Sequence, residues 1–183
     1  MDIRVLGLGN VLMGDDGFGP YVIEALNATY EFAPEVTVAD VGTPGLDLTP
    51  YLMGADAVIV VDTVRADGEP GTIRLYRRDD ILRHAPQPRL GPHDPGLKET
   101  LLALAFDGSG PADVLLVGVI AQRTEPSPHL TGTVRAAVPD AVAEVVRELG
   151  RLRAAPTPRA RPCAVAPWWE REIFDRRGIS PGP

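Results

Sequence analysis

The first twenty residues contain the feature that most constrains how this chain folds. Residues 3 to 8 form a short apolar run of the kind that a buried β-strand needs. Glycines at positions 7, 9, 14, 17 and 19 then punctuate a loop, and Pro20 suits the first turn of a helix. The chain is therefore expected to open with a strand, a glycine-rich loop and a helix.

Two adjacent carboxylates, Asp15 and Asp16, lie at the far end of this loop. A loop that binds phosphate offers backbone N–H groups, and two carboxylates there would repel a pyrophosphate. The G-x-G-x-x-G pattern also fails, because Leu12 occupies the position of the third glycine. Two interpretations stay open: Asp16 caps the following helix, where Asp is favoured, or it presents its carboxylate to a cation.

Length and composition are those of a single globular domain, with 183 residues of which 44% are hydrophobic and 23% charged. The one cysteine, Cys163, excludes an internal disulfide and a cysteine-based metal site. The N-terminus has no basic region, and no apolar run reaches membrane-spanning length. These features predict a cytoplasmic protein without membrane insertion.

The net charge of −7 is distributed unevenly along the chain. Residues 151–183 contain seven arginines against three acidic residues, a balance of +4, which leaves −11 for the remainder. A body this acidic is a poor nucleic-acid binder, so no nucleic-acid partner is expected.

Apolar periodicity predicts an alternation of strands and helices. The strands are expected at residues 3–8, 36–39, 57–61, 72–76 and 114–120, with the fourth at a sheet edge. The helices are expected at residues 18–29, 46–53, 93–106 and 133–152, with polar loops at 83–92 and 121–131. This order predicts an α/β fold with a central, mostly parallel sheet and helices on both faces.

The last thirty residues differ from the rest, so we divide the chain into a domain at 1–153 and a tail at 154–183. The tail is rich in Arg and Pro and has no long apolar periodicity, which predicts that it is partly flexible. Its four large apolar side chains are expected to dock on a partner or on the body: Trp168, Trp169, Ile173 and Phe174.

Three side chains that suit metal binding fall at the ends of predicted elements. Asp16 follows the first strand, Asp62 ends the central strand, and His93 opens the third helix. Ligands of such folds bind at the carboxyl edge of the sheet, so the three are expected to converge there. Two carboxylates and an imidazole suit a first-row divalent metal. Taken alone, His93 is equally consistent with a solvent-exposed residue at a helix start.

Nucleophilic catalysis finds little support. There is no G-x-S-x-G elbow, and Cys163 lies in the tail. His84 and His129 fall in polar loops and are expected to be ordinary surface residues. Peptide hydrolysis by such a chain would need a water activated by a metal or by a carboxylate base, for which Asp15 and Asp40 are the spare candidates.

Four motifs, in order along residues 3–150, resemble those of the hydrogenase maturation endopeptidases. They are Gly-Leu-Gly-Asn-Val-Leu-Met-Gly-Asp-Asp-Gly-Phe-Gly at 7–19, Asp-Val-Gly-Thr-Pro-Gly at 40–45, Val-Val-Asp at 60–62 and His-Asp-Pro-Gly-Leu at 93–97. The resemblance implies a three-layer α/β/α sandwich. It also implies an aspartyl-type endopeptidase that removes the C-terminal extension of the large-subunit precursor of a nickel–iron hydrogenase after nickel insertion.

The same resemblance assigns roles to six residues. The metal-binding and catalytic residues would be Asp16, Asp62 and His93, and the substrate-recognition residues would be Asp40, Gly42 and Gly45. The nickel would be supplied by the precursor, so the free protein need not carry a metal.

The chain departs from the family pattern at two places, and two other functions stay open. Asp16 stands where many members have Glu, and residues 121–126 only loosely match the usual glycine–glutamine–proline segment. One alternative is a nucleotide-binding α/β protein. The other is a non-catalytic chaperone of the same fold that binds nickel or the precursor.

Overall fold

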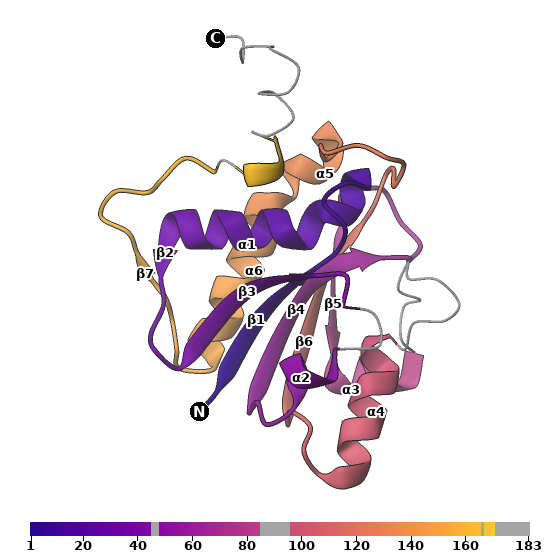
Figure 1. Cartoon of the computed structure of the whole chain (residues 1–183), viewed down its shortest axis with the longest axis vertical. Coiled ribbons are helices and arrows are strands. Elements are labelled where there is room, and N and C mark those ends of the chain that lie inside the picture. The colour runs from indigo at the N-terminus through magenta and orange to yellow at the C-terminus, as the bar shows by residue number, and fades with distance from the viewer. Residues whose placement is uncertain (45–47, 85–95, 166, 171–183) are drawn as a thin grey trace.

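The computed structural model of this chain describes residues 1–44, 48–84, 96–165 and 167–170. Its centre is a five-stranded sheet in the order β3-β1-β4-β6-β5 (Figure 1). Four of these strands are parallel to one another, and β5 (Ile73–Arg77) is an antiparallel edge strand. The parallel strands are β1 (Ile3–Leu8), β3 (Val36–Gly42), β4 (Ala57–Val64) and β6 (Asp113–Ile120).

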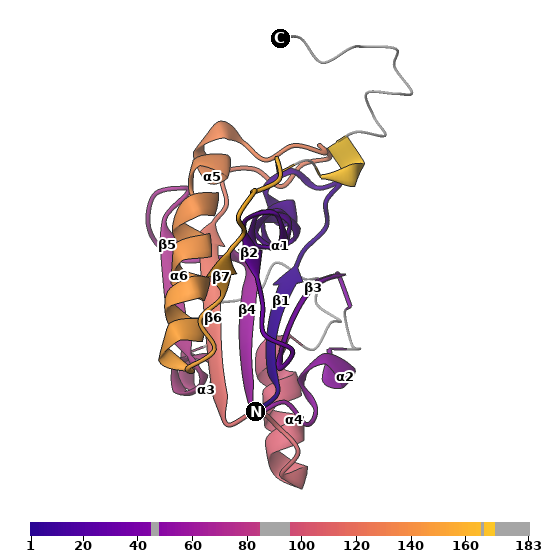
Figure 2. The same ribbon diagram turned by 90° about the vertical axis from the view of Figure 1, so that its left-hand side faces the viewer.

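Helices cover both faces of this sheet, as Figure 2 shows in side view. One face carries α1 (Phe18–Thr29), α5 (Gly132–Ala136) and α6 (Val138–Arg151). The other carries α2 (Thr49–Leu52), α3 (Arg78–His84) and α4 (Leu97–Asp107). The predicted three-layer α/β/α architecture with a mostly parallel sheet is confirmed.

The strands are apolar throughout because each face of the sheet is buried under a helical layer. In β4, Ala57, Ile59 and Val61 point into the core shared with α1 and α6. Val58, Val60 and Val64 point into the core on the α2–α4 side. Successive side chains of a strand alternate between faces, so a strand buried on both needs a continuous apolar run.

The helix α1 begins in close contact with the ends of β1 and β4. A Cβ atom added at Gly19 would lie 2.2 Å from the Leu8 carbonyl oxygen and 2.5 Å from that of Val61. Only glycine permits this approach, which brings the start of α1 directly onto the carboxyl edge of the sheet.

Two strands continue further than the sequence predicts. β4 runs through Asp62 to Val64, because β6 continues to pair with it as far as Ile120. β3 likewise runs to Gly42, so Asp40 lies inside a strand and not in the turn after it. The prediction that Asp62 closes the central strand is therefore wrong by two residues.

Three helical features also differ from prediction. The helix α3 occupies the start of the region predicted as a loop. The helix α4 begins at Leu97 after Gly96, so the predicted start at His93 is four residues too early. The predicted last helix is divided into α5 and α6 at Ala137, because Pro139 cannot donate a backbone hydrogen bond and occupies the first turn of α6.

Part of the segment after residue 153 packs on the body. The strand β7 (Thr157–Pro158) pairs antiparallel with β2 (Tyr30–Glu31). The Cys163 N–H donates to the Ala28 carbonyl oxygen at 3.0 Å. Further on, Trp169 is buried with its ring edge-on to that of Tyr21 at 5.3 Å. The boundary between the two regions at residue 153 stays a prediction.

This docked segment ends in a polar cluster around Glu170. Its carboxylate accepts hydrogen bonds from Tyr21 and from Arg135, the latter at 2.7 Å. The Nδ1 atom of His129 lies 3.0 Å from the same carboxylate oxygen. The prediction that His129 is an ordinary surface residue is therefore incomplete, because it contacts the docked segment. None of the described helices is long and apolar enough to span a bilayer.

Candidate active site

The loop between β1 and α1 folds back on itself at the carboxyl edge of the sheet. Gly9 has a φ of +132°, and a Cβ atom there would lie 1.8 Å from the Asp16 carbonyl oxygen. The Gly9 N–H donates to the Gly42 carbonyl oxygen at 2.8 Å, which ties the loop to the end of β3. The loop begins at Gly9, directly after β1. These contacts bring Asp16, seven residues further on, back to the end of that strand.

Asp16 is held by two donors, neither of which belongs to α1. The Asn10 N–H donates to Oδ2 at 3.0 Å, and the Thr63 hydroxyl donates to Oδ1 at 3.3 Å. The N-cap residue of α1 is Gly17, and no side chain caps this helix. The interpretation of Asp16 as a helix cap is therefore wrong, and its half-buried carboxylate faces β4.

Asp62 lies in β4 where the neighbouring strand β1 has ended. The last β1 residue to pair with β4 is Gly7, opposite Val61, whereas β6 still pairs with Asp62 through Gly118. The Asp62 carboxylate is half-buried and accepts a 2.7 Å hydrogen bond from the Thr63 N–H. The structure therefore brings Asp16 and Asp62 together, as the sequence predicts, at the gap that β1 leaves.

The carboxyl group of Asp62 has an unusually high pKa. Burial raises the pKa of the Asp62 carboxyl to about 7, against hydrogen bonds from Thr63, and the charge of Asp16 raises it further. Near neutral pH this carboxyl therefore exchanges a proton readily. A divalent cation would relieve the repulsion between the two carboxylates, so their oxygen atoms fit a metal of the kind predicted.

Asp15 points away from this site and has a structural role. Its buried Oδ2 accepts hydrogen bonds from the N–H groups of Gln122 and Arg123 at 2.9 and 2.8 Å. Thr131 donates its N–H to Oδ1 at 2.7 Å and its hydroxyl to Oδ2 at 3.0 Å. Because the Asp15 carboxylate already accepts four hydrogen bonds, it is not the spare carboxylate base that the sequence suggested.

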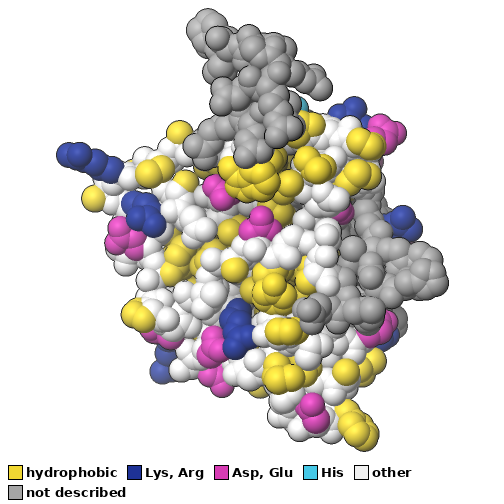
Figure 3. All heavy atoms as spheres, viewed as in Figure 1, with side chains coloured by type: hydrophobic (Ala, Val, Ile, Leu, Met, Phe, Trp, Pro, Cys, Tyr) yellow, Lys and Arg dark blue, Asp and Glu magenta, His cyan; other side chains and the backbone are white. Residues whose placement is uncertain are grey.

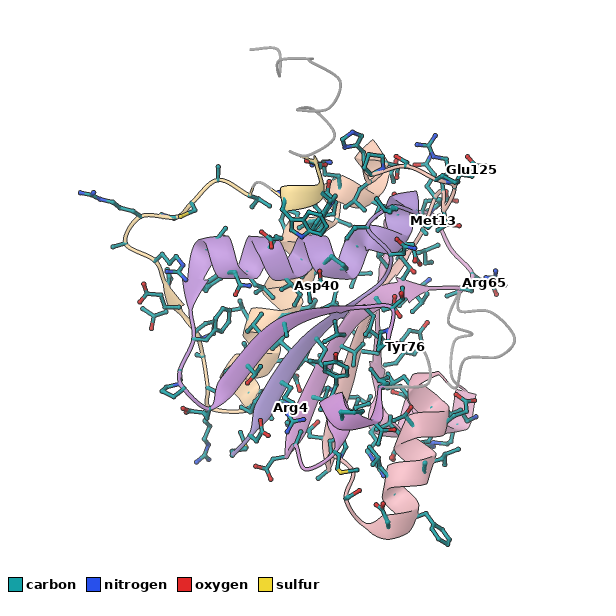
Figure 4. The ribbon with its side chains drawn as sticks, in the orientation of Figure 1. Arg4, Met13, Asp40, Arg65, Tyr76 and Glu125 are labelled. Carbon is teal, nitrogen blue, oxygen red and sulfur yellow. The ribbon has the colours of Figure 1, made fainter. Side chains whose placement is uncertain are left out.

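These bonds attach the loop after β6 to the loop after β1. The backbones of Met13 and Ser127 form a bridge, and the Gly14 N–H donates to the Ser127 carbonyl oxygen at 2.8 Å. Figure 4 shows Met13, Glu125 and Arg65 at the same end of the sheet, beyond the ends of β1, β6 and β4. The two joined loops form one side of the candidate site.

The predicted recognition residues are only partly described. Asp40 is exposed near the end of β3, and its Oδ1 accepts a 2.9 Å hydrogen bond from the Gly42 N–H. Gly42 has a φ of +60°, a left-handed conformation that favours glycine. Gly45 and His93 lie outside the described residues. Within the described ranges, no group of three or more His, Cys, Asp or Glu side chains could hold a metal ion.

The sequence analysis did not identify two residues that contact the carboxylates. Asn10 contributes only its backbone N–H, so its side chain carries no signal. Thr63 is 1% exposed and reads as one more β-branched residue of a buried strand. Its position next to Asp62 was the only available indication.

Comparison with known proteins gives a consistent result. The family model described as hydrogenase maturation protease matches residues 20–148. A hydrogenase expression/formation protein, HupD, from Rhizobium leguminosarum bv. viciae is 35% identical over 95% of this chain and 87% of its own. The hydrogenase 2 maturation protease of Escherichia coli K12 is 35% identical over 81% of this chain and 91% of its own.

Among solved structures, the E. coli hydrogenase maturating endopeptidase HybD superposes with a TM-score of 0.79 at 34% identity. The match covers 87% of this chain and 99% of that protein. The fold thus belongs to a class of peptide-bond hydrolases. The chain is a member of the hydrogenase maturation protease family. This assignment decides for a hydrolase over the nucleotide-binding and non-catalytic alternatives.

Proposed function

We propose that this protein removes the C-terminal extension of a nickel-loaded nickel–iron hydrogenase large-subunit precursor. The observation that carries the proposal is the convergence of Asp16 and Asp62 at the gap beside β4, in a member of the maturation protease family. The relatives' names refer to hydrogenase maturation and formation, which supports a hydrogenase precursor as the substrate.

Asp16 and Asp62 would bind the nickel that the precursor carries, with His93 as the third ligand. Asp16 is oriented for this role by the Asn10 N–H and Asp62 by the Thr63 N–H. Nickel bound in this way would polarise the scissile carbonyl group or an attacking water. Nickel is in this scheme part of the substrate, so the metal selects a precursor that is ready for cleavage.

A carboxylate base offers a second route to the same hydrolysis. A carboxyl group with a pKa near 7 can take a proton from water and return it to the leaving amine at neutral pH. Asp62 has this property, whereas Asp15 is occupied by its four donors. The two routes differ in their requirement for nickel in the precursor.

We further propose that Asp40, Gly42 and Gly45 contact the precursor. Asp40 is exposed, and its carboxylate is oriented by the Gly42 N–H at the end of β3. The Gly42 carbonyl oxygen is bonded to Gly9 in the loop that positions Asp16. A peptide bound there would lie beside the carboxylate pair. On the face shown in Figure 3, acidic and basic side chains are interspersed with apolar ones.

The experiment is a cleavage assay with purified full-length protein and two precursor samples, one nickel-loaded and one nickel-free. Intact-mass spectrometry would detect the loss of a C-terminal peptide. Cleavage of the nickel-loaded sample alone supports the metal route, and cleavage of both supports the carboxylate base. An intact precursor in both samples would contradict the proposed function.

The division of the chain can be tested in the same assay. A chain that ends at Arg153 is expected to retain cleavage, because Asp16, Asp62 and His93 all precede this residue. It should be less stable than the full chain, since the buried contact of Trp169 with Tyr21 is lost. A folded but inactive 1–153 chain would show that the tail contributes to the site.

A further inference from the structure

Among the residues that the structure describes, Thr63 is the one that hydrogen-bonds to both carboxylates of the candidate site. Its N–H donates to Asp62 at 2.7 Å, and its hydroxyl donates to Asp16 at 3.3 Å. The residue is buried in β4 immediately after Asp62, so the strand fixes its backbone.

We infer that Thr63 is a positioning residue that holds Asp16 and Asp62 in the arrangement that binds metal. This inference rests on the proposed function, because it concerns the same site. The hydroxyl has one proton and lies between two like charges, so it restrains Asp16 without adding charge. The 3.3 Å distance to Asp16 is longer than the ~2.7–2.8 Å usual for an O–H donor, so this hydrogen bond is a weak one.

The short side chain of Asp16 places its carboxylate within reach of Thr63. A Glu at this position would be one methylene longer. A shorter side chain keeps its carboxylate near β4, within reach of the Thr63 hydroxyl. The hydroxyl and the short carboxylate are therefore expected to act as a pair, whose coupling can be measured.

The first test is nickel affinity of the full-length protein by isothermal titration calorimetry. Thr63→Val keeps the shape of the side chain and removes the hydroxyl, and the loss of such an outer contact typically weakens metal binding about 10- to 100-fold. Thr63→Ser retains the hydroxyl and should restore affinity to within about threefold of the original chain on the same reasoning. Rescue by Ser would assign the loss of affinity to the hydroxyl and not to the methyl group.

The matched control is Thr100→Val, which removes the hydroxyl of another buried threonine, in α4. This substitution should leave nickel affinity unchanged. Urea midpoints of all variants would show whether any loss of affinity comes from loss of folded protein.

The second test is a double-mutant cycle with Asp16→Glu. The longer side chain carries its carboxylate away from Thr63, so Thr63→Val should cost much less affinity in this background than in the original chain. Equal losses in both backgrounds would show that Thr63 does not act through Asp16.

The third measurement is kcat/KM for cleavage of the nickel-loaded precursor by the same variants. Thr63→Val is expected to lower it by the same roughly 10- to 100-fold as nickel affinity, with rescue by Thr63→Ser. Unchanged nickel affinity together with unchanged kcat/KM in Thr63→Val would overturn the inference. If the original chain leaves the precursor uncut, the proposed function fails, while calorimetry still reports on Thr63.

Discussion

Two adjacent carboxylates in η1 (Gly14–Gly17) have different surroundings and different roles. Asp15 is buried and receives four hydrogen bonds from the loop after β6. Asp16 and Asp62 share only a few donors at the end of β4, and burial and mutual repulsion raise the pKa of Asp62. We call the first group the clamp and the second the carboxylate pair.

The difference separates stability from function. A buried carboxylate with all its donors in place contributes to stability, whereas an incompletely satisfied pair destabilises the fold and persists where function needs it. The clamp joins segments more than one hundred residues apart, and the pair exposes its charge to a ligand. Substitutions in the clamp should therefore mainly lower stability, and substitutions in the carboxylate pair should mainly lower activity.

The largest effect is expected on cleavage when the carboxylate pair is changed. Asp16→Asn and Asp62→Asn should each lower the rate of precursor cleavage by roughly 1,000-fold or more, since each removes a charge that binds or activates the substrate. Rates from intact-mass time courses would test this. Circular dichroism should show folded protein, and full activity in either variant would remove that residue from the site.

The next largest effect is expected on stability when the clamp is broken. Asp15→Ala leaves four partly buried donors without their acceptor, so the free energy of unfolding should fall by about 3–5 kcal/mol. Urea denaturation would measure the loss. Asp16→Ala is the neighbouring control and should cost far less. Equal losses of unfolding free energy in Asp15→Ala and Asp16→Ala would contradict the distinction between clamp and carboxylate pair.

A smaller loss is expected from Thr131→Val, which removes one donor to Asp15. The Thr131 hydroxyl also accepts from the Val134 N–H and so caps α5. Loss of both contacts should cost about 1–2.5 kcal/mol, measured by the same denaturation. Thr131→Ser keeps both contacts and is the control. A loss in Thr131→Ser as large as that in Thr131→Val would assign the effect to the methyl group.

The smallest effect is a pH dependence of stability caused by Asp62. Its pKa is about 7 in the folded protein against an ordinary value of 3.8, so the folded state keeps a proton that the unfolded state has lost. Stability therefore falls as pH rises through this window, and Asp62→Asn removes the fall. Between pH 4 and pH 8 the Asp62→Asn variant should gain about 1–2 kcal/mol of unfolding free energy relative to the original chain, because the side chain is only half-buried and its charge is partly screened. Urea midpoints across this range would measure it, and parallel curves for the two proteins would contradict it.

Much of the fold could be predicted because its signals are local in sequence. The apolar run at residues 3–8 and the glycines after it specify the first strand, loop and helix, all of which the structure contains. Continuous β-branched runs specified the buried strands β4 and β6. Strand ends were predicted less well, since pairing with β6 carries β4 past Asp62.

The site was predicted in part for the same reason. Asp16 and Asp62 could be found because parallel strands bring their carboxyl ends to one edge of the sheet. His93 remains a proposed ligand outside the described residues, and Thr63 carried no signal beyond its place next to Asp62. The structural role of Asp15 could not be predicted, because its donors lie more than one hundred residues away in the sequence.

The sequence by itself determined the α/β fold, the family and the two carboxylates of the site, because each depends on motifs a few residues long. Only the tertiary structure decided what the neighbouring Asp15 does. Its role depends on donors at Gln122, Arg123 and Thr131, which reach Asp15 only after β6 has joined the sheet. The direction of a side chain is set by its long-range partners, and these exist only in the folded chain.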